Sequence, residues 1–179
     1  MALVKKKKIR FFLKNAYIRE APVRLYPYPV VEKIEDEKHD RPWRAFFIEN
    51  EYIKLMILPE LGGRIQMAYD KMKKRHFVYY NQVIKPALVG LTGPWISGGI
   101  EFNWPQHHRP STYLPTDCMI EEFPDGSKTI WCSEVERMFR TKVWQALPSI
   151  REKLTSKSRQ RCTTVLRSRR LSCGGLIRQ

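Results

Sequence analysis

"WRAFFIENEYIKLMILPELGGRIQMAYD", residues 43–70, is the stretch that decides the fold. It is rich in β-branched and aromatic residues. Ile53, Leu55 and Ile57 recur at every second position, which is the period of a β-strand. Two adjacent glycines then precede "RIQMAY", so we expect a tight turn or a bulge that leads into a second strand. The stretch therefore predicts consecutive strands and a mainly β fold.

The sequence that follows this stretch keeps the same texture. "HFVYYN" (76–81) is a third strand candidate. "CMIEEFPDGSKTIWCSEV" (118–135) places Pro-Asp-Gly between two strand-like runs, which is the strongest hairpin signal in the chain. From 84 to 115 the chain is rich in glycine and proline and is too irregular for a helix. We expect this passage to be one long loop that carries function.

Positive charge is concentrated at the two ends of the chain. The 179 residues carry a formal net charge of +15. Residues 1–23 contain seven Lys and Arg against one acid, and residues 143–179 contain nine against one, whereas the middle is almost neutral. A total of this size raises a small nucleic-acid-binding protein as an alternative. Aromatic residues do not interleave with these charges, so we expect incidental anion binding there and no specific nucleic acid.

The sequence also argues against two other classes of protein. No apolar run approaches the length that spans a bilayer, so no membrane partner is expected. The four cysteines form no Cys-x-x-Cys pair, which argues against zinc, and we expect neither a metal nor a cofactor. This cysteine usage suits a reduced, cytoplasmic chain.

Four motifs carry a resemblance to a known family: "YPYPV", "ENEYIKLMILPELGGRI", "VIKPALVGLTGPWISGGIEFNWPQHHRPS" and "EEFPDGSKTIWCSEVERMFRTK". They resemble the domain-of-unknown-function family numbered 5107 over about residues 25–142. That family is often joined to tetratricopeptide repeats and is similar to galactose mutarotase-like β-sandwiches. The resemblance implies a carbohydrate-binding sandwich, with carbohydrate-active chemistry in the parent family left open between isomerisation and hydrolysis.

The two basic ends do not continue the family pattern in this reading frame. The family has Gly-Met-Ala-Gly-Ile after Arg-Thr-Lys, and the codons of residues 143–147 permit this sequence when they are regrouped one nucleotide earlier. The codons of residues 8–23, regrouped in the same direction, likewise permit a sequence that resembles the family. We therefore interpret 1–23 and 143–179 as out-of-frame, disordered segments that flank a truncated sandwich domain at 24–142. Such a chain is expected to be inactive or to have no function of its own.

The candidate site is "GPWISGGIEFNWPQHHRP", residues 93–110. A sugar site needs flat apolar faces for the pyranose ring and polar groups for its hydroxyls. The substrate-binding candidates are Arg64, Trp95, Asn103, Trp104 and Arg109. Mutarotase-like chemistry needs a base at the anomeric hydroxyl and an acid at the ring oxygen, and the catalytic candidates are Glu101, His107 and His108.

Structural roles compete with these assignments. Adjacent His107 and His108 cannot both face one site if the segment is extended, because neighbouring side chains diverge. Glu101 could form only a buried ion pair with Arg109. Arg64, after its two glycines, could pair with Glu60 or Asp70 at the surface instead of reaching a sugar.

Overall fold

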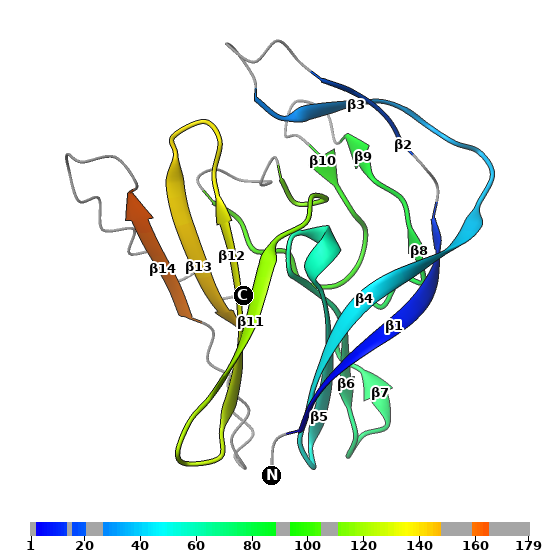
Figure 1. The fold of residues 1–179 in the computed structure, drawn as a ribbon. Coiled ribbons are helices and arrows are strands. Elements are labelled where there is room, and N and C mark those ends of the chain that lie inside the picture. The colour runs from blue at the N-terminus through cyan, green and yellow to red at the C-terminus, as the bar shows by residue number, and fades with distance from the viewer. Residues whose placement is uncertain are drawn as a thin grey trace.

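The chain folds into two facing β-sheets. The computed structural model describes residues 3–13, 16–20, 27–88, 94–104, 111–147 and 159–164. These residues contain no α-helix, only a short 3₁₀ helix, η1 (Pro59–Leu61). One sheet has six strands in the order β7-β6-β5-β4-β1-β8, and the other has four in the order β11-β12-β13-β14 (Figure 1). The expectation of a mainly β, sandwich-like fold is confirmed.

The strands have the following bounds. The six-stranded sheet consists of β1 (Leu3–Leu13), β4 (His39–Glu49), β5 (Ile53–Leu58), β6 (Arg64–Asp70), β7 (Arg75–His76) and β8 (Val83–Ile84). The four-stranded sheet consists of β11 (Asp117–Glu122), β12 (Lys128–Val135), β13 (Thr141–Leu147) and β14 (Arg159–Thr164). Two smaller pairs join β2 (Ala16–Glu20) to β3 (Pro29–Ile34) and β9 (Ala87–Leu88) to β10 (Pro94–Trp95). The β1–β8 pairing is parallel, and the other pairings between strands are antiparallel.

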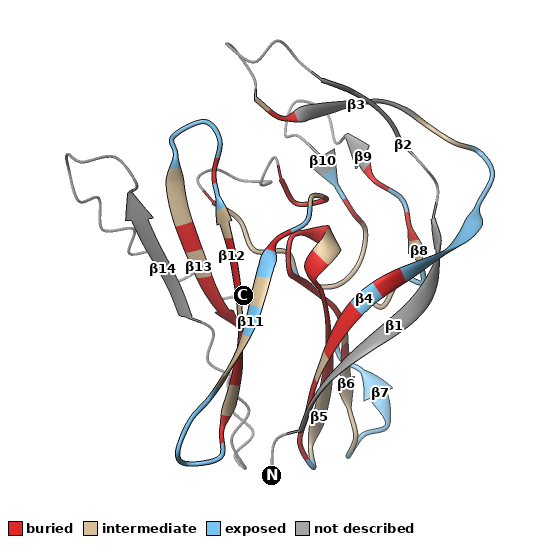
Figure 2. Cartoon of the chain, in the orientation of Figure 1, coloured by how far each residue is buried: buried red, intermediate tan, exposed pale blue. Residues whose placement is uncertain are grey.

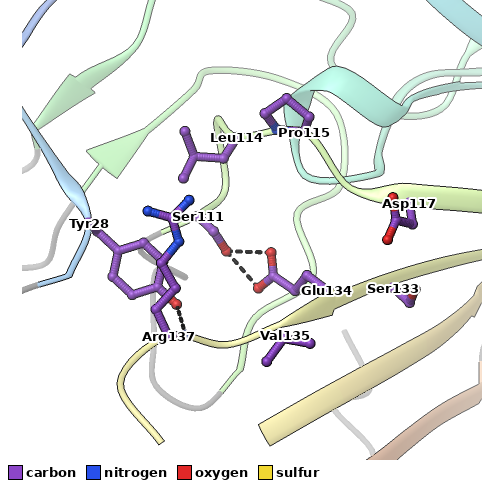
Figure 3. A pocket seen from close by; sticks show the side chains of 9 residues that line it. All are labelled: Tyr28, Ser111, Leu114, Pro115, Asp117, Ser133, Glu134, Val135 and Arg137. Carbon is purple, nitrogen blue, oxygen red and sulfur yellow. Dashed lines mark hydrogen bonds between the residues drawn. The ribbon is translucent and has the colours of Figure 1, made fainter. Parts of the chain in front are cut away.

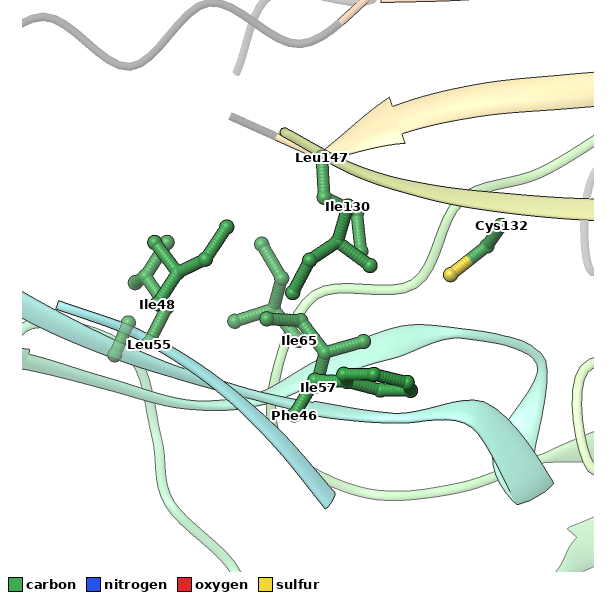
Figure 4. Close-up of a cluster of buried hydrophobic side chains, with 9 residues drawn as sticks. Phe46, Ile48, Leu55, Ile57, Ile65, Ile130, Cys132 and Leu147 are labelled. Atoms are coloured by element: carbon green, nitrogen blue, oxygen red, sulfur yellow. The ribbon is translucent and has the colours of Figure 1, made fainter. Parts of the chain in front are cut away.

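The first core cluster lies between the two sheets. Figure 4 shows side chains of β4, β5 and β6 meeting those of β12 and β13. Because antiparallel partners share a face, Phe46 lies beside Ile57 and Ile48 beside Leu55. The buried members of this cluster are Phe46, Ile48, Leu55, Ile57, Ile65, Ala68, Ile130, Cys132 and Leu147.

A second core cluster covers the other face of the same strands. Its buried members are Trp43, Ala45, Met56, Leu58, Leu61, Ile84, Ile96 and Tyr113. Side chains of successive residues point to opposite faces of a strand, so β5 and the second half of β4 are buried on both sides, whereas the first four residues of β4 are exposed (Figure 2). Ile96 and Tyr113, which lie outside the six-stranded sheet, pack on this face of it together with Ile84 of β8. Ile96 belongs to the candidate loop.

The expected hairpin and the two central strands are confirmed. β5 and β6 occupy the stretch that decided the fold, and β11 pairs with β12 across the Pro-Asp-Gly turn. The expected strand at 76–81 is wrong beyond β7, which ends at His76. From Phe77 onward the chain leaves the β6 edge, after one hydrogen bond from the Phe77 amide to the Ala68 carbonyl (3.1 Å).

The structure also differs from the expected disorder at the two ends. β1 pairs with the full length of β4, from Leu3 opposite Glu49 to Leu13 opposite His39, and so covers what would be an open sheet edge. β13 continues through residues 143–147, where Val143 and Leu147 are buried on the side that meets the six-stranded sheet. These residues pair with β12, from Val143 opposite Glu134 to Leu147 opposite Ile130.

Candidate functional site

The turn between η1 and β6 fixes the start of β6. Gly62 (φ +66°) and Gly63 (φ +69°) both adopt the left-handed conformation that favours glycine. The Gly62 amide donates to the Leu114 carbonyl at 2.8 Å. A Cβ at Gly63 would lie 2.8 Å from both Cβ and Sγ of Cys132 on the facing sheet. The expected turn is confirmed, and it brings the two sheets into close contact.

The Arg64 side chain forms hydrogen bonds with the backbone of the candidate loop. Its side chain is only 2% exposed. Nη2 donates to the Ile96 carbonyl at 3.1 Å and also to the Gly98 carbonyl. Arg64 is therefore buried beneath the loop rather than on the surface, and it fixes the loop backbone. Its contact with a substrate stays a prediction.

The two acids considered as surface partners of Arg64, Glu60 and Asp70, contact other groups. Glu60 forms ion pairs with Arg44 at 3.2 Å and Arg41 at 3.8 Å. Oδ1 of Asp70 accepts hydrogen bonds from the amides of the next turn, those of Met72 and Lys73, both at 2.9 Å. Glu60 therefore links η1 to β4, and Asp70 stabilises the turn that follows β6.

Gly98 and Gly99 allow the loop to pack against β6. Their φ angles are +80° and +70°. A Cβ at Gly99 would lie 2.3 Å from the Ile65 carbonyl oxygen, so no other residue fits without movement of the backbone. Ile100 then exchanges two backbone hydrogen bonds with Ile65, at 2.8 and 3.2 Å. The glycines serve this close approach of backbone to backbone.

The two tryptophans of the loop have different environments. Trp95, in β10, is 38% exposed, and its ring is accessible to a ligand. Trp104 is 7% exposed, so its ring is enclosed by protein. The expectation that Trp104 presents a free stacking face does not fit this burial. The sequence of a loop does not show which of its tryptophan rings will be buried against the protein.

Of the five remaining site candidates of the loop, the structure describes two. Glu101 and Asn103 are half-buried, with Phe102 between them packed on the cluster between the sheets. His107, His108 and Arg109 lie outside the described residues. The structure therefore groups Arg64, Trp95, Glu101, Asn103 and Trp104 in or under one loop.

A recess lies between Tyr28, the segment that starts at Ser111 and the end of β12, and no local sequence signal points to it. The cavity measures about 200 Å³, and Figure 3 shows the side chains that line it. Ser111 donates to the Glu134 carboxylate, with its Oγ 2.6 and 2.7 Å from the two carboxylate oxygens. Glu134 follows Ile130 and Cys132 on the inner face of β12, so this face changes from apolar to charged at its end. The lining residues are Tyr28, Ser111, Leu114, Pro115, Asp117, Ser133, Glu134, Val135 and Arg137.

A buried carboxylate fixes one wall of this recess. Glu136 is fully buried and accepts hydrogen bonds from the Tyr28 hydroxyl (2.7 Å) and from the amides of Met138 (2.7 Å) and Phe139 (2.6 Å). The Tyr28 oxygen accepts in turn from the Arg137 amide at 2.7 Å. Burial is the main cause that raises the pKa of the Tyr28 hydroxyl, and the Glu136 hydrogen bond adds to it. The tyrosine therefore stays a neutral donor.

Within the described parts of the chain, no three His, Cys, Asp or Glu side chains gather as metal ligands. Nor does any helix in those parts reach the length and apolarity of a bilayer span.

Comparison with known proteins identifies the family. A family model described as a domain of unknown function, DUF5107, matches residues 20–160. The chain belongs to the DUF5107 family. The DUF5107 match contains the glycine turns, the loop and every residue that lines the recess, and it reaches through β13.

One solved structure is similar to this DUF5107 chain. It is the crystal structure of a TPR-domain containing protein from Parabacteroides distasonis ATCC 8503, with a TM-score of 0.74 and 20% sequence identity. The similarity covers 82% of this chain and 26% of that one, so this chain spans about a quarter of the neighbour's length. At this identity the likeness concerns the fold, and it agrees with the expected association of the family with tetratricopeptide repeats.

Proposed function

We propose that this DUF5107 chain is a carbohydrate-binding β-sandwich of the mutarotase-like kind, whose ligand occupies the recess at the end of β12. The observation that carries the proposal is the lining of that recess. Carboxylates of Asp117 and Glu134 lie with serine hydroxyls and the Arg137 side chain around a cavity of about 200 Å³. The predicted binding loop leads along the chain to Ser111 in this lining.

The chemistry of the lining suits a sugar. Carboxylates accept hydrogen bonds from neighbouring hydroxyls, and a guanidinium donates to hydroxyl oxygens, whereas Leu114, Pro115 and Val135 offer apolar surface to ring C–H groups. Pockets for drug-sized ligands measure about 300–1,000 Å³. The smaller recess therefore favours a single sugar ring over a longer oligosaccharide.

The loop residues supply the second part of the proposed site. Trp95 keeps its proposed role as a stacking face because its ring is partly exposed. Arg64 acts in this proposal by holding the Ile96 and Gly98 carbonyls, and thus the loop, in place. Glu101 with His107 or His108 remains the proposed base and acid for a mutarotase-like reaction.

The test is a sugar-binding titration on the full chain and on two matched variants. Calorimetry with a panel of hexoses first identifies a ligand. Glu134→Gln keeps the shape and can still accept from Ser111, but it loses the charge, so affinity should fall about tenfold or more. Glu122→Gln removes an exposed carboxylate that pairs with Lys128 next to the hairpin turn, away from the recess lining, and should leave affinity unchanged. Equal affinities for both variants, or no hexose bound by the folded chain, would refute the proposal.

A further inference from the structure

Two cysteine thiols face each other across the hairpin. Cys118 of β11 and Cys132 of β12 are direct partners in the antiparallel register. Their Sγ atoms lie 2.8 Å apart, and no disulfide joins them. The two thiols are thus within hydrogen-bond distance, and their separation exceeds the roughly 2.05 Å of a disulfide bond.

The strand geometry is suited to a bond between them. Directly opposed residues of antiparallel strands have Cα atoms roughly 4.5–5.5 Å apart. Disulfides span Cα distances of about 4.4–6.8 Å, so the backbone need not move. The sulfur–sulfur distance would have to shorten by roughly 0.8 Å to reach bond length, which small side-chain rotations can supply.

The two thiols differ in how they can be reached. Cys132 is 1% exposed and belongs to the core cluster between the sheets, where Gly63 packs on it. Cys118 is half-buried and has the Thr116 hydroxyl 3.7 Å from its sulfur. The hydrogen bond with Cys132 lowers the pKa of the Cys118 thiol, which favours the reactive thiolate. A small oxidant therefore meets Cys118 first.

We propose that Cys118 and Cys132 form a reversible disulfide, with Cys118 as the site of attack on hydrogen peroxide and Cys132 as the resolving thiol. This proposal is independent of the carbohydrate site. The Cys118 thiolate attacks one peroxide oxygen, the O–O bond breaks, and the leaving hydroxide takes up a proton to become water, which leaves a sulfenic acid. The Cys132 sulfur then attacks the Cys118 sulfur and the sulfenic oxygen leaves as a second water. Two thiols thus lose two electrons and two protons, and one peroxide becomes two waters.

The experiment maps the disulfide in the full chain after peroxide treatment. Lys128 lies between the two cysteines, so trypsin cuts the chain there and a disulfide appears as two joined peptides in the mass spectrum. The folded protein should give peptides joined through Cys118 and Cys132, and a thiol reductant should separate them. The same treatment in denaturant should scatter the pairing over all four cysteines.

Two variants make the result specific. The double variant Cys162→Ser, Cys173→Ser should keep the joined peptides, because it retains the hairpin pair. In Cys132→Ser the two peptides should not be joined, because the resolving thiol is missing. Cys118 should then accumulate as a sulfenic acid that dimedone traps. Separate, fully alkylated peptides from peroxide-treated wild type would overturn the proposal, as would joining of Cys118 to Cys162 or Cys173 in the folded protein.

Discussion

Replacement of Gly99 by alanine tests the contact between the candidate loop and β6. The new Cβ would lie 2.3 Å from the Ile65 carbonyl oxygen, where an ordinary contact needs 3.4 Å or more. Both groups belong to backbone, so no side-chain rotation relieves the clash. The loop would have to move by roughly 1 Å, which is enough to lengthen the hydrogen bonds between Ile100 and Ile65 beyond useful distance.

The expected loss follows from these contacts. Alanine at φ +70° costs about 1–2 kcal/mol because its Cβ disfavours the left-handed conformation. Each of the two backbone hydrogen bonds contributes about 1 kcal/mol net. Gly99→Ala should therefore lower the free energy of unfolding by about 3–4 kcal/mol.

Gly126→Ala is the matched control. Gly126 has a similar φ of +75°, but nothing lies within 4 Å of the Cβ position. This variant should lose only the conformational part, about 1–2 kcal/mol. Urea denaturation followed by circular dichroism measures both. Equal losses in the two variants would show that the loop does not pack on β6 in this way.

Four further predictions follow from burial, charge and reading frame. Trp104→Ala should lower the free energy of unfolding by about 3–5 kcal/mol, whereas the exposed Trp95→Ala should change it by less than about 0.5 kcal/mol; similar values in urea melts would contradict the assigned burial. The hydrogen bond from Lys71 (2.5 Å) is the main cause that lowers the pKa of Glu49, so this ion pair stabilises the fold above the unfolded pKa and the stabilisation disappears as pH falls through the folded pKa. Glu49→Gln should thus cost under about 1 kcal/mol at neutral pH and nothing in acid, and a difference from wild type that persists in acid would exclude this cause. Gln145 is buried and neither amide atom has a hydrogen-bond partner in the described structure, so Gln145→Met should stabilise the chain by about 1 kcal/mol; an unchanged or lower denaturation midpoint would count against it. The gene, read one nucleotide earlier after Lys142, should continue the family pattern, and a stop codon or unrelated residues in that frame would refute the frameshift interpretation.

Part of the fold could be predicted because its signals are local. The alternation in β5 and the glycine pair before β6 are visible in a short window, and so is the Pro-Asp-Gly turn. That turn also held an unused signal for the thiol pair. Cys118 and Cys132 each lie seven residues from Asp125, so a hairpin centred there places them opposite each other.

The recess could not be predicted in the same way. Tyr28 comes from the start of the domain, Ser111 from the end of the loop, and Glu134 from the second sheet, and only the packing of the sheets brings them together. The burial of Trp104 and Arg64 is likewise a tertiary property. Their residue types suggested ligand contacts, but Trp104 is 7% exposed and Arg64 lies under the loop carbonyls of Ile96 and Gly98.

The burial of β5 and of the second half of β4 on both faces has a consequence for how the chain unfolds. These strands contribute to both core clusters. Phe46 and Ile57 belong to the cluster between the sheets, and Trp43 and Leu58 belong to the cluster on the outer face. If the packing on either face were lost, the strands would expose a continuous apolar surface to water. The two clusters should therefore melt together, in a single cooperative transition, and spectroscopic probes placed in each should report coincident midpoints.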